Sequence, residues 1–302
     1  MINRRFILYL KGERGLTVFR AIHSLGYLPL YVFLESEDCR SIDLLKELEL
    51  DYQIVGNPKC HEHIEFVRNL MPALIVCAGY SKLIPSSIID IPEIGIINCH
   101  GGSLPKYRGA SPIPWQLING ETSGTAYVLK LTAGVDDGEI LASENYSIDS
   151  TDTAREVTDK VLAIFSRLVP GVLSQIAESG TLPAGTLQSA NDVTRWAKRY
   201  PEDGEIDWDS NVQAIINLVR ALNKPYPGAF FKVQGLQVTV WRAKVLPENY
   251  RGVPGRVLGR RSGSLIVACR DGAISLEEVE LDGSILNGDK LPFQYGFLLS
   301  KN

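Results

Sequence analysis

The sequence predicts a mostly parallel, Rossmann-like α/β sheet followed by a smaller antiparallel β-barrel of OB-like type. The first half alternates short apolar runs with amphipathic segments, which is the pattern of βαβ units. Runs such as 74–78 are apolar throughout, as in strands that are covered on both faces. Beyond residue 228, apolar and polar residues alternate between turn residues, which indicates antiparallel strands with one buried face.

The elements of the first half can be assigned in order from these patterns. Strands are expected at residues 6–10, 28–34, 52–55, 73–79, 94–100 and 125–131. Helices are expected at residues 16–25, 41–50, 63–70, 112–118 and 152–178. Thr151 and Asp152 are suited to cap the start of the last helix, and Gly180 is suited to end it.

Two domains are expected from the chain length of 302 residues, since single domains usually run to about 100–200 residues. The larger domain covers residues 1–180. Residues 181–203 are mixed and polar, contain Pro183 and Pro201, and are expected to form a linker. The second domain covers residues 204–302, with a helix at 211–222 and strands at 229–233, 236–245, 256–258, 265–269 and 273–281.

The composition is that of a soluble globular protein, with 45% hydrophobic and 22% charged residues. We find no apolar run near the roughly 20 residues that a membrane-spanning helix needs, so no membrane partner is expected. The five cysteines are odd in number and form no C-x-x-C pair, which fits a reducing cytoplasm. The formal net charge of −4 disfavours a nucleic-acid partner.

Two segments have residue types that occur in metal or phosphate sites. Cys60, His61, Glu62 and His63 carry metal-ligand side chains, but they fall where a loop enters a predicted helix, and a solvated helix start is the favoured interpretation. The loop at 11–15 lacks both the G-x-G-x-x-G spacing and a Walker lysine. We therefore expect neither a metal nor a dinucleotide site.

The residues with the clearest chemical potential follow the strand at 94–100. In an open parallel sheet, ligands bind beyond the carboxyl ends of the strands. Asn98 and His100 are two residues apart, so they face the same side of a strand. The carboxamide can donate to an oxyanion, and a neutral imidazole can accept a proton from an amine. Taken alone, the pair favours simpler structural roles, with Asn98 capping a turn and His100 as a polar residue at the sheet edge.

Two neighbouring features strengthen the functional interpretation. Gly101, Gly102 and Gly109 bracket a loop that contains Pro105, as is needed where backbone approaches a ligand closely. The strand at 125–131 leads into Asp136, which is expected to bring a carboxylate to the same edge of the sheet. A carboxylate beside an imidazole and an amide completes an acid/base set.

The string N-C-H-G-G-S-L-P-K-Y-R-G, followed about 25 residues later by G-V-D-D-G-E-I, resembles the folate-dependent formyltransferase family. The resemblance assigns the catalytic roles to Asn98, His100 and Asp136, and it implies the family's formyltransferase fold for the first domain. Asp136 is chosen over Asp137 because the family pattern is D-x-G. The co-substrate implied is 10-formyltetrahydrofolate, and the resemblance requires no metal.

The resemblance extends over nearly the whole chain. Residues 72–85 are similar to the segment that lines the family's pterin pocket, and residues 204–208, 218–222 and 227–230 are similar to the start of its C-terminal domain. The folate-binding residues implied are Ala78, Gly79, Tyr80, Ile84, Val135 and Gly138. The residues implied for binding the acceptor substrate are Gly102, Lys106, Tyr107 and Arg108. Gly102 departs from the family pattern, in which serine is common.

The amine that accepts the formyl group is the least determined feature. Residues 204–302 contain 12 Lys+Arg and 10 Asp+Glu, a difference of +2, and the segment 35–40 is short and acidic, which weighs against tRNA. Stretches 100–109, 115–122 and 238–241 are similar to enzymes that formylate nucleotide-linked amino sugars. We therefore favour a nucleotide-linked amino sugar, with methionyl-tRNA formyltransferase and, less favoured, formyltetrahydrofolate hydrolase as alternatives. A homodimer is left open.

Overall fold

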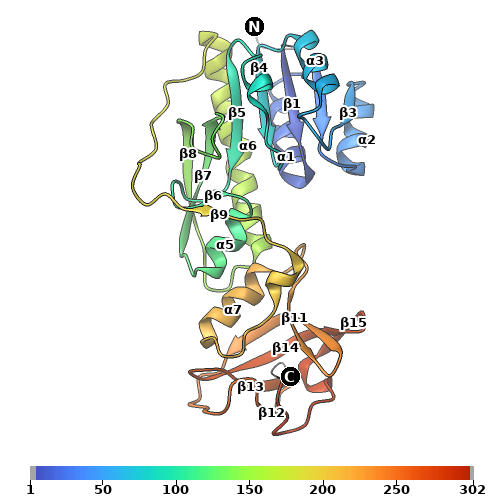
Figure 1. Ribbon diagram of the computed structural model, residues 1–302, viewed down its shortest axis with the longest axis vertical. Coiled ribbons are helices and arrows are strands. Elements are labelled where there is room, and N and C mark those ends of the chain that lie inside the picture. Colours follow the sequence, from blue (N-terminus) through green and yellow to red (C-terminus); the bar gives the residue numbers. More distant parts are fainter. Residues whose placement is uncertain (1–4, 300–302) are drawn as a thin grey trace. The chain divides into compact units, whose positions relative to one another are not determined.

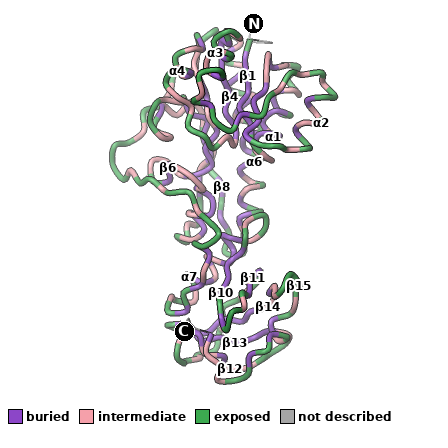
Figure 2. The backbone as a smooth tube through the Cα atoms, turned by 45° about the vertical axis from the view of Figure 1, so that its right-hand side comes forward, coloured by how far each residue is buried: buried purple, intermediate pink, exposed green. Residues whose placement is uncertain are grey.

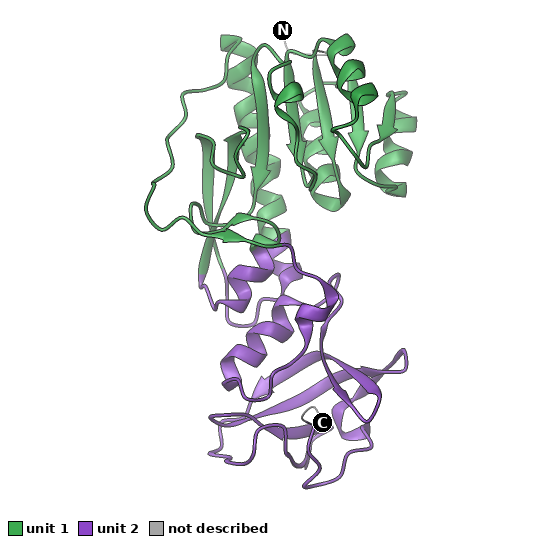
Figure 3. Cartoon of the chain, in the orientation of Figure 1, with its two compact units in different colours: residues 1–112, 123–147, 159–197 green, residues 113–122, 148–158, 198–302 purple. Residues whose placement is uncertain are grey.

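The computed structural model describes residues 5–299. The chain divides into two compact units (Figure 3). Unit 1 comprises residues 1–112, 123–147 and 159–197, and unit 2 comprises residues 113–122, 148–158 and 198–302. The domain boundaries expected from the sequence remain a prediction.

Unit 1 is built on a seven-stranded sheet with the order β3-β2-β1-β4-β5-β7-β8 (Figure 1). The strands are β1 (Phe6–Leu10), β2 (Tyr31–Leu34), β3 (Tyr52–Ile54), β4 (Leu74–Ala78), β5 (Gly95–His100), β7 (Ser123–Lys130) and β8 (Ile140–Ser147). The first five are parallel to one another, whereas β7 is antiparallel to β5 and β8 is antiparallel to β7. The expected mostly parallel, Rossmann-like sheet is thus confirmed.

Helices follow the parallel strands as expected for βαβ units. They are α1 (Gly12–Ser24), α2 (Cys39–Glu47), α3 (His61–Leu70) and a short α4 (Ser86–Ile89) that the sequence pattern did not indicate. Later in the chain come α5 (Pro112–Ile118) and α6 (Ala154–Ser179), which each contain residues of both units. A further two-stranded sheet pairs β6 (Arg108–Gly109) in parallel with β9 (Arg195–Trp196).

The core of unit 1 forms because the central strands are apolar on both faces. β1 and β4 are buried at every position, as Figure 2 shows. On one face Ile7, Tyr9 and Ile75 lie in a cluster with Val67 of α3 and Ile88 of α4. The central strands are therefore fixed by packing, and the segments at their carboxyl ends are held in register with them.

One described helix, α6, is long and apolar enough to cross a membrane by length and composition. This helix contradicts the expectation, from the sequence, of no apolar run long enough to cross a membrane. In the structure, 44% of the most apolar stretch of α6 is buried inside the protein, and core helices of soluble proteins pass the same test. The helix buries Val161, Phe165, Val169 and Leu173 along one side, at intervals of four residues.

Unit 2 contains an antiparallel sheet with the order β10-β11-β14-β13-β12, and β15 pairs with β14. Its strands are β10 (Ala229–Val233), β11 (Leu236–Val245), β12 (Val257–Arg261), β13 (Ser264–Ala268), β14 (Ala273–Leu281) and β15 (Ser284–Asn287). The other elements are α7 (Val212–Ala221) and two 3-10 turns, η1 (Pro201–Gly204) and η2 (Gly288–Lys290). The antiparallel arrangement was predicted correctly. Since the pairing over residues 5–299 does not join β10 to β12, closure into a barrel stays a prediction.

Candidate active site

The three residues predicted to be catalytic lie together at the carboxyl end of β5. Nδ2 of Asn98 donates to Oδ1 of Asp136 at 3.3 Å. Nδ1 of His100 lies 3.4 Å from Oδ2 of the same carboxylate. Asn98 and His100 reach one carboxylate because alternate residues of a strand share a face.

The strand that leads to Asp136 runs in the direction opposite to the expected one. β7 is antiparallel to β5, with Leu129 opposite Asn98 and Tyr127 opposite His100. The end of β7 therefore points away from the end of β5, but the Asp136 carboxylate still lies at the expected edge of the sheet, beside Asn98 and His100. The connection 131–139 turns back instead, with a positive φ of 48° at Asp136, and this turn delivers the carboxylate to the site.

The loop after β5 holds the Asp136 carboxylate from its other side. The main-chain N–H of Gly109 donates to Oδ2 of Asp136 at 2.9 Å. Gly109 has φ of 100°, and a Cβ there would lie 2.4 Å from the carbonyl oxygen of Trp196. Glycine is required at this position because any side chain would collide with β9.

The imidazole of His100 is enclosed, with 4% of its surface exposed. Nε2 lies 2.7 Å from the main-chain oxygen of Tyr107, and because this oxygen only accepts, Nε2 carries a hydrogen. Burial lowers the pKa of His100, and the Asp136 carboxylate and the Tyr107 carbonyl oppose that shift in part. The lowered pKa indicates a neutral ring whose hydrogen is on Nε2, so that Nδ1 can accept a proton. The Asp136 carboxylate would stabilise the imidazolium formed in this way.

The residues implied for acceptor binding differ in their environments. Gly102 is packed so closely that a Cβ would lie 2.4 Å from Pro112 and 3.3 Å from Nε2 of His100, which explains glycine here. Lys106 is exposed, whereas Tyr107 is buried and stacks on Trp196 with 5.6 Å between ring centroids. Arg108 is buried too, and its Nε and Nη2 donate to Oε1 of Gln188 at 3.0 and 2.8 Å.

The residues implied for folate binding come from two segments. Cys77 and Ala78 end β4 opposite Asn98 and Cys99 of β5, so the segment that follows begins at the level of His100. In this segment Gly79 bridges to Leu10, and Oη of Tyr80 donates to the carbonyl of Val55 at 2.8 Å. The remaining residues are Ile84, which packs on the core cluster of unit 1, and Val135 and Gly138, which flank Asp136 and Asp137.

The edge of the sheet near this segment contains a polar cluster that the sequence interpretation missed. Nζ of Lys11 lies 2.5 Å from Oε1 of the buried Glu35, and the backbone N–H of Ser81 donates to Oε2 at 2.5 Å. The residues follow β1, β2 and β4, which are adjacent in the sheet. The available signal was that Lys11 and Glu35 directly follow parallel strands and that Ser81 comes three residues after one.

The sequence does not indicate a role for Gln188 or the contact of Trp196 with the loop after β5, because residues 181–203 are expected to form a linker. Nε2 of Gln188 donates to the carbonyls of Asp136 and Gly138 at 2.8 and 2.9 Å. Nε1 of Trp196 donates to the carbonyl of Lys106 at 2.9 Å. A tryptophan in an otherwise polar stretch was the single sequence signal that this segment is held against the loop after β5.

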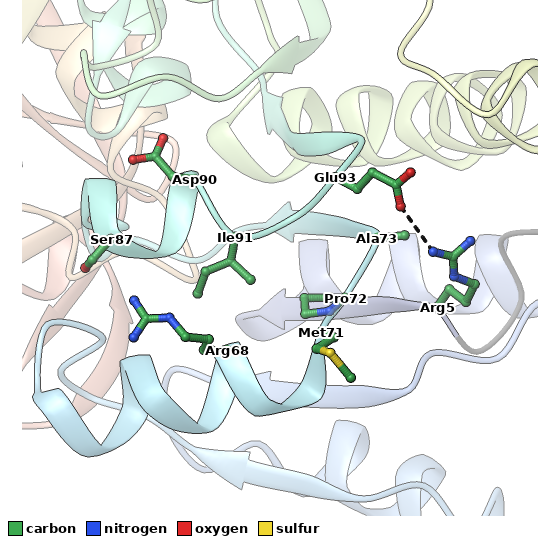
Figure 4. A pocket seen from close by; sticks show the side chains of 9 residues that line it. All are labelled: Arg5, Arg68, Met71, Pro72, Ala73, Ser87, Asp90, Ile91 and Glu93. Carbon is green, nitrogen blue, oxygen red and sulfur yellow. Dashed lines mark hydrogen bonds and ion pairs between the residues drawn. The ribbon is translucent and has the colours of Figure 1, made fainter.

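A surface hollow of about 530 Å³ lies elsewhere on unit 1 (Figure 4). Arg5, Ala73 and Glu93, which line it, precede β1, β4 and β5, and Arg5 pairs with Glu93 at 3.2 Å. The hollow therefore lies at the amino ends of the parallel strands, away from Asn98. None of the residues implicated in catalysis or binding lines it.

Within residues 5–299, no three His, Cys, Asp or Glu side chains gather as metal ligands. His63 of the segment 60–63 is buried instead, and its Nε2 lies 2.7 Å from Oη of Tyr9. All five cysteines are free thiols.

An open, mostly parallel sheet whose fifth strand ends in an amide and an imidazole that share one carboxylate has the donor and the acid/base groups that acyl transfer to an amine uses. The chain belongs to the formyl transferase family. The model of the formyl transferase domain matches residues 55–173, and the model of the formyl transferase C-terminal domain matches residues 198–291. The protein is therefore a formyltransferase, and formyltetrahydrofolate is the family's formyl donor.

The individual relatives carry different names. The methionyl-tRNA formyltransferase of Acetivibrio thermocellus is 36% identical over 231 residues, which are 75% of this chain and 72% of that enzyme. The bifunctional polymyxin resistance protein ArnA of Wigglesworthia glossinidia brevipalpis is 30% identical over 285 residues, 90% of this chain and 42% of ArnA. Among solved structures, the N-formyltransferase of Helicobacter canadensis, in complex with folinic acid and dTDP-3-aminofucose, has a TM-score of 0.68 at 14% identity. That likeness covers 91% of this chain and 99% of the other.

Proposed function

We propose that this protein transfers the formyl group of 10-formyltetrahydrofolate to the primary amine of a nucleotide-linked amino sugar in the cytoplasm. The observation that carries the proposal is the single carboxylate of Asp136, which contacts Nδ2 of Asn98, Nδ1 of His100 and the N–H of Gly109. The products are an N-formylated sugar nucleotide and tetrahydrofolate.

The chemistry proposed is direct attack of the neutral amine on the formyl carbon. A C–N bond forms, and the formyl oxygen becomes an oxyanion that the amide of Asn98 stabilises by donating a hydrogen bond. The attacking nitrogen gives its proton to the pair formed by His100 and Asp136, and the same pair then protonates the departing N10 of the folate. The carbon–N10 bond breaks, and N10 receives the proton that the amine lost. The reaction requires neither a metal nor a covalent enzyme intermediate.

The lowered pKa of His100 suits this role. Burial keeps the imidazole neutral near pH 7, so that Nδ1 is free to accept a proton. The carboxylate 3.4 Å away stabilises the imidazolium that results. The Nε2 hydrogen bond to Tyr107 fixes the orientation of the ring during both transfers.

The folate is proposed to lie along residues 78–84 and 135–138. The first segment follows β4, which pairs with β5 beside Asn98, and the second contains Asp136. Both positions support a folate whose formyl group is bound near the amide and the carboxylate. The proposed folate contacts are Ala78, Gly79, Tyr80, Ile84, Val135 and Gly138. The acceptor is proposed to meet Gly102, Lys106, Tyr107 and Arg108.

An amino sugar is favoured over tRNA by charge. Residues 204–302 carry a net charge of +2, and β2 leads into an acidic segment whose Glu35 is already paired with Lys11. tRNA affinity depends on neutralising many phosphates, and a short acidic segment does not supply that. The structural likeness to an enzyme complexed with dTDP-3-aminofucose supports the same choice.

Methionyl-tRNA is the second candidate acceptor, because relatives named methionyl-tRNA formyltransferase reach 36% identity. The test is to incubate the purified protein with 10-formyltetrahydrofolate and either a panel of nucleotide-linked amino sugars or methionyl-tRNA. Tetrahydrofolate release and product mass are followed, with His100→Ala as the control. A formylated sugar nucleotide that the control does not make supports the proposal. Formyl-methionyl-tRNA alone would refute the sugar acceptor, and folate turnover without an acceptor would indicate a hydrolase.

A further inference from the structure

Gln188 uses both ends of its side-chain amide. Oε1 accepts from Nε and Nη2 of Arg108, and Nε2 donates to the carbonyls of Asp136 and Gly138. All four distances lie between 2.8 and 3.0 Å. Arg108 only donates and the two carbonyls only accept, so the orientation of the amide is fixed by its partners.

The backbone around Gln188 is anchored on both sides. Two residues before it, Thr186 exchanges both main-chain hydrogen bonds with Ile140, at 2.8 and 2.9 Å. Further along, β9 pairs with β6, which contains Arg108. Leu187 and Ser189 are exposed, whereas Gln188 is half-buried. The side chain is thus directed at the turn that carries Asp136.

The turn at 136–138 needs contacts from other segments to keep its backbone conformation. Asp136 has φ of 48°, a conformation that costs a non-glycine residue free energy unless its surroundings impose it. Gln188 holds the main chain of Asp136 and Gly138, while the N–H of Gly109 holds the carboxylate. Asn98 and His100 contact only the carboxylate.

We infer that Gln188 is a positioning residue for formyl transfer, which fixes the turn at 136–138 so that the Asp136 carboxylate reaches Asn98 and His100 together. Arg108 fixes the orientation of the Gln188 amide by donating two hydrogen bonds to its Oε1. This inference rests on the proposed role of Asp136. It gives the segment between the two family-matched regions a part in the reaction.

Two substitutions separate positioning from folding. Gln188→Leu keeps the approximate size and removes all four hydrogen bonds. Gln188→Glu keeps an acceptor for Arg108, so it should preserve the attachment of this segment to Arg108. It replaces the N–H donor that faces the carbonyls of Asp136 and Gly138 by an oxygen, so it should disturb the turn at 136–138. Gln175→Leu, on the exposed side of α6, is the matched control.

The first readout is steady-state kinetics with whichever acceptor the wild-type enzyme uses, beside the thermal unfolding midpoint. Both Gln188 variants should lower kcat about 10- to 100-fold, as a misplacement of about 1 Å does, with little change in KM. Gln188→Glu should keep a near wild-type unfolding midpoint. Gln175→Leu should match the wild type in both measurements.

The second readout is the titration of His100 by NMR, which needs no substrate and is tractable because the chain has four histidines. The Asp136 carboxylate raises the pKa of His100 against the effect of burial. In Gln188→Leu the carboxylate moves away, so His100 should titrate at a lower pH than in the wild type. His100→Gln assigns the resonance.

A fall in kcat with a displaced His100 titration supports the inference. An unchanged kcat, or a fall that merely follows a lower unfolding midpoint with His100 titrating as before, overturns it. A change confined to KM also overturns it, because Gln188 would then contact substrate. If the wild type formylates no acceptor, the proposed function fails, and the His100 titration alone still decides this inference.

Discussion

The main-chain N–H of Gly109 donates to Oδ2 of Asp136 at 2.9 Å. Oδ2 also faces Nδ1 of His100 at 3.4 Å, so one carboxylate oxygen ties the loop after β5 to the imidazole on β5. The remaining oxygen, Oδ1, accepts from Asn98. The geometry of the site therefore depends on where the backbone places Gly109 as well as on the side chains.

Gly109→Ala should damage both activity and stability. The new Cβ would lie 2.4 Å from the Trp196 carbonyl, and φ of 100° is strained for alanine. The strand pair β6·β9 must shift, which moves the N–H away from Asp136. We expect a loss of about 2 kcal/mol in the free energy of unfolding and a fall in kcat of about 10-fold or more. Urea denaturation and formyl-transfer kinetics measure the two effects.

Gly180→Ala is the control for backbone strain. Gly180 has φ of 75°, but a Cβ there would have no atom within 4 Å. It should lose about 1 kcal/mol of stability and keep wild-type kcat. Equal kinetic losses in the two variants would show that Gly109 acts only through general stability.

Lys11→Met should destabilise unit 1 and weaken folate binding. Burial raises the pKa of Glu35, but hydrogen bonds from Lys11 and Ser81 outweigh burial and hold it below its ordinary value. Without Lys11, a carboxylate that is 5% exposed loses its charged partner, which should cost about 1–3 kcal/mol at pH 7. Ser81 lies in the proposed folate segment, so the Kd for folate should rise.

The pH dependence of the free energy of unfolding tests whether the Glu35 carboxylate stabilises the protein. A carboxylate with a lowered folded pKa stabilises the protein above its unfolded pKa of about 4.3 and loses this effect as the pH falls through the folded value. Denaturation midpoints of wild type and Lys11→Met should therefore converge at acid pH. A difference that stays constant from pH 7 to pH 3 would contradict the role given to the ion pair.

His63 should make the protein less stable in mild acid. It is 5% exposed, Nδ1 has no hydrogen-bond partner among the described residues, and burial lowers its pKa. The unfolded chain binds a proton at about pH 6.5 and the folded protein only at lower pH, so stability falls as the pH decreases through this interval. His63→Gln keeps a polar partner for Tyr9 without titrating, and urea midpoints should show a weaker pH dependence between pH 7.5 and 5. An unchanged dependence would exclude His63 as a source.

Elements whose pattern repeats locally could be predicted from the sequence. The bounds of β10, β11 and β14 agree with the expected ranges, because alternation sets their faces and Gln234-Gly235 adopt positive φ values of 51° and 78° in the hairpin turn. β8 was missed because most of its side chains are exposed or half-buried, so no apolar pattern marks it. The antiparallel direction of β7 depends on how the segment between β5 and β7 connects the two strands, and the residues of β7 themselves do not indicate it.

The site could be predicted in part for the same reasons. Asn98 and His100 end a strand whose apolar run is plain in the sequence, and Asp136 was assigned by a family motif. The hold that Gln188 exerts on Asp136 spans 52 residues, and nothing in the polar sequence around Gln188 indicates it. Long-range hydrogen bonds of this kind become visible only once the fold brings the segments together.

The role of Asp136 in proton transfer is tested most directly by a single-turnover formyl-transfer assay that compares Asp136→Asn with Asp137→Asn. Asp137 is exposed and accepts a hydrogen bond from Thr132, so its variant is a neighbouring control of identical chemistry. We predict that Asp136→Asn lowers the rate about 100- to 1,000-fold, the size expected for a proton-relay group, while Asp137→Asn stays near the wild-type rate. Equal rates for the two variants, or a normal rate for Asp136→Asn, would show that the Asp136 carboxylate is not needed for formyl transfer.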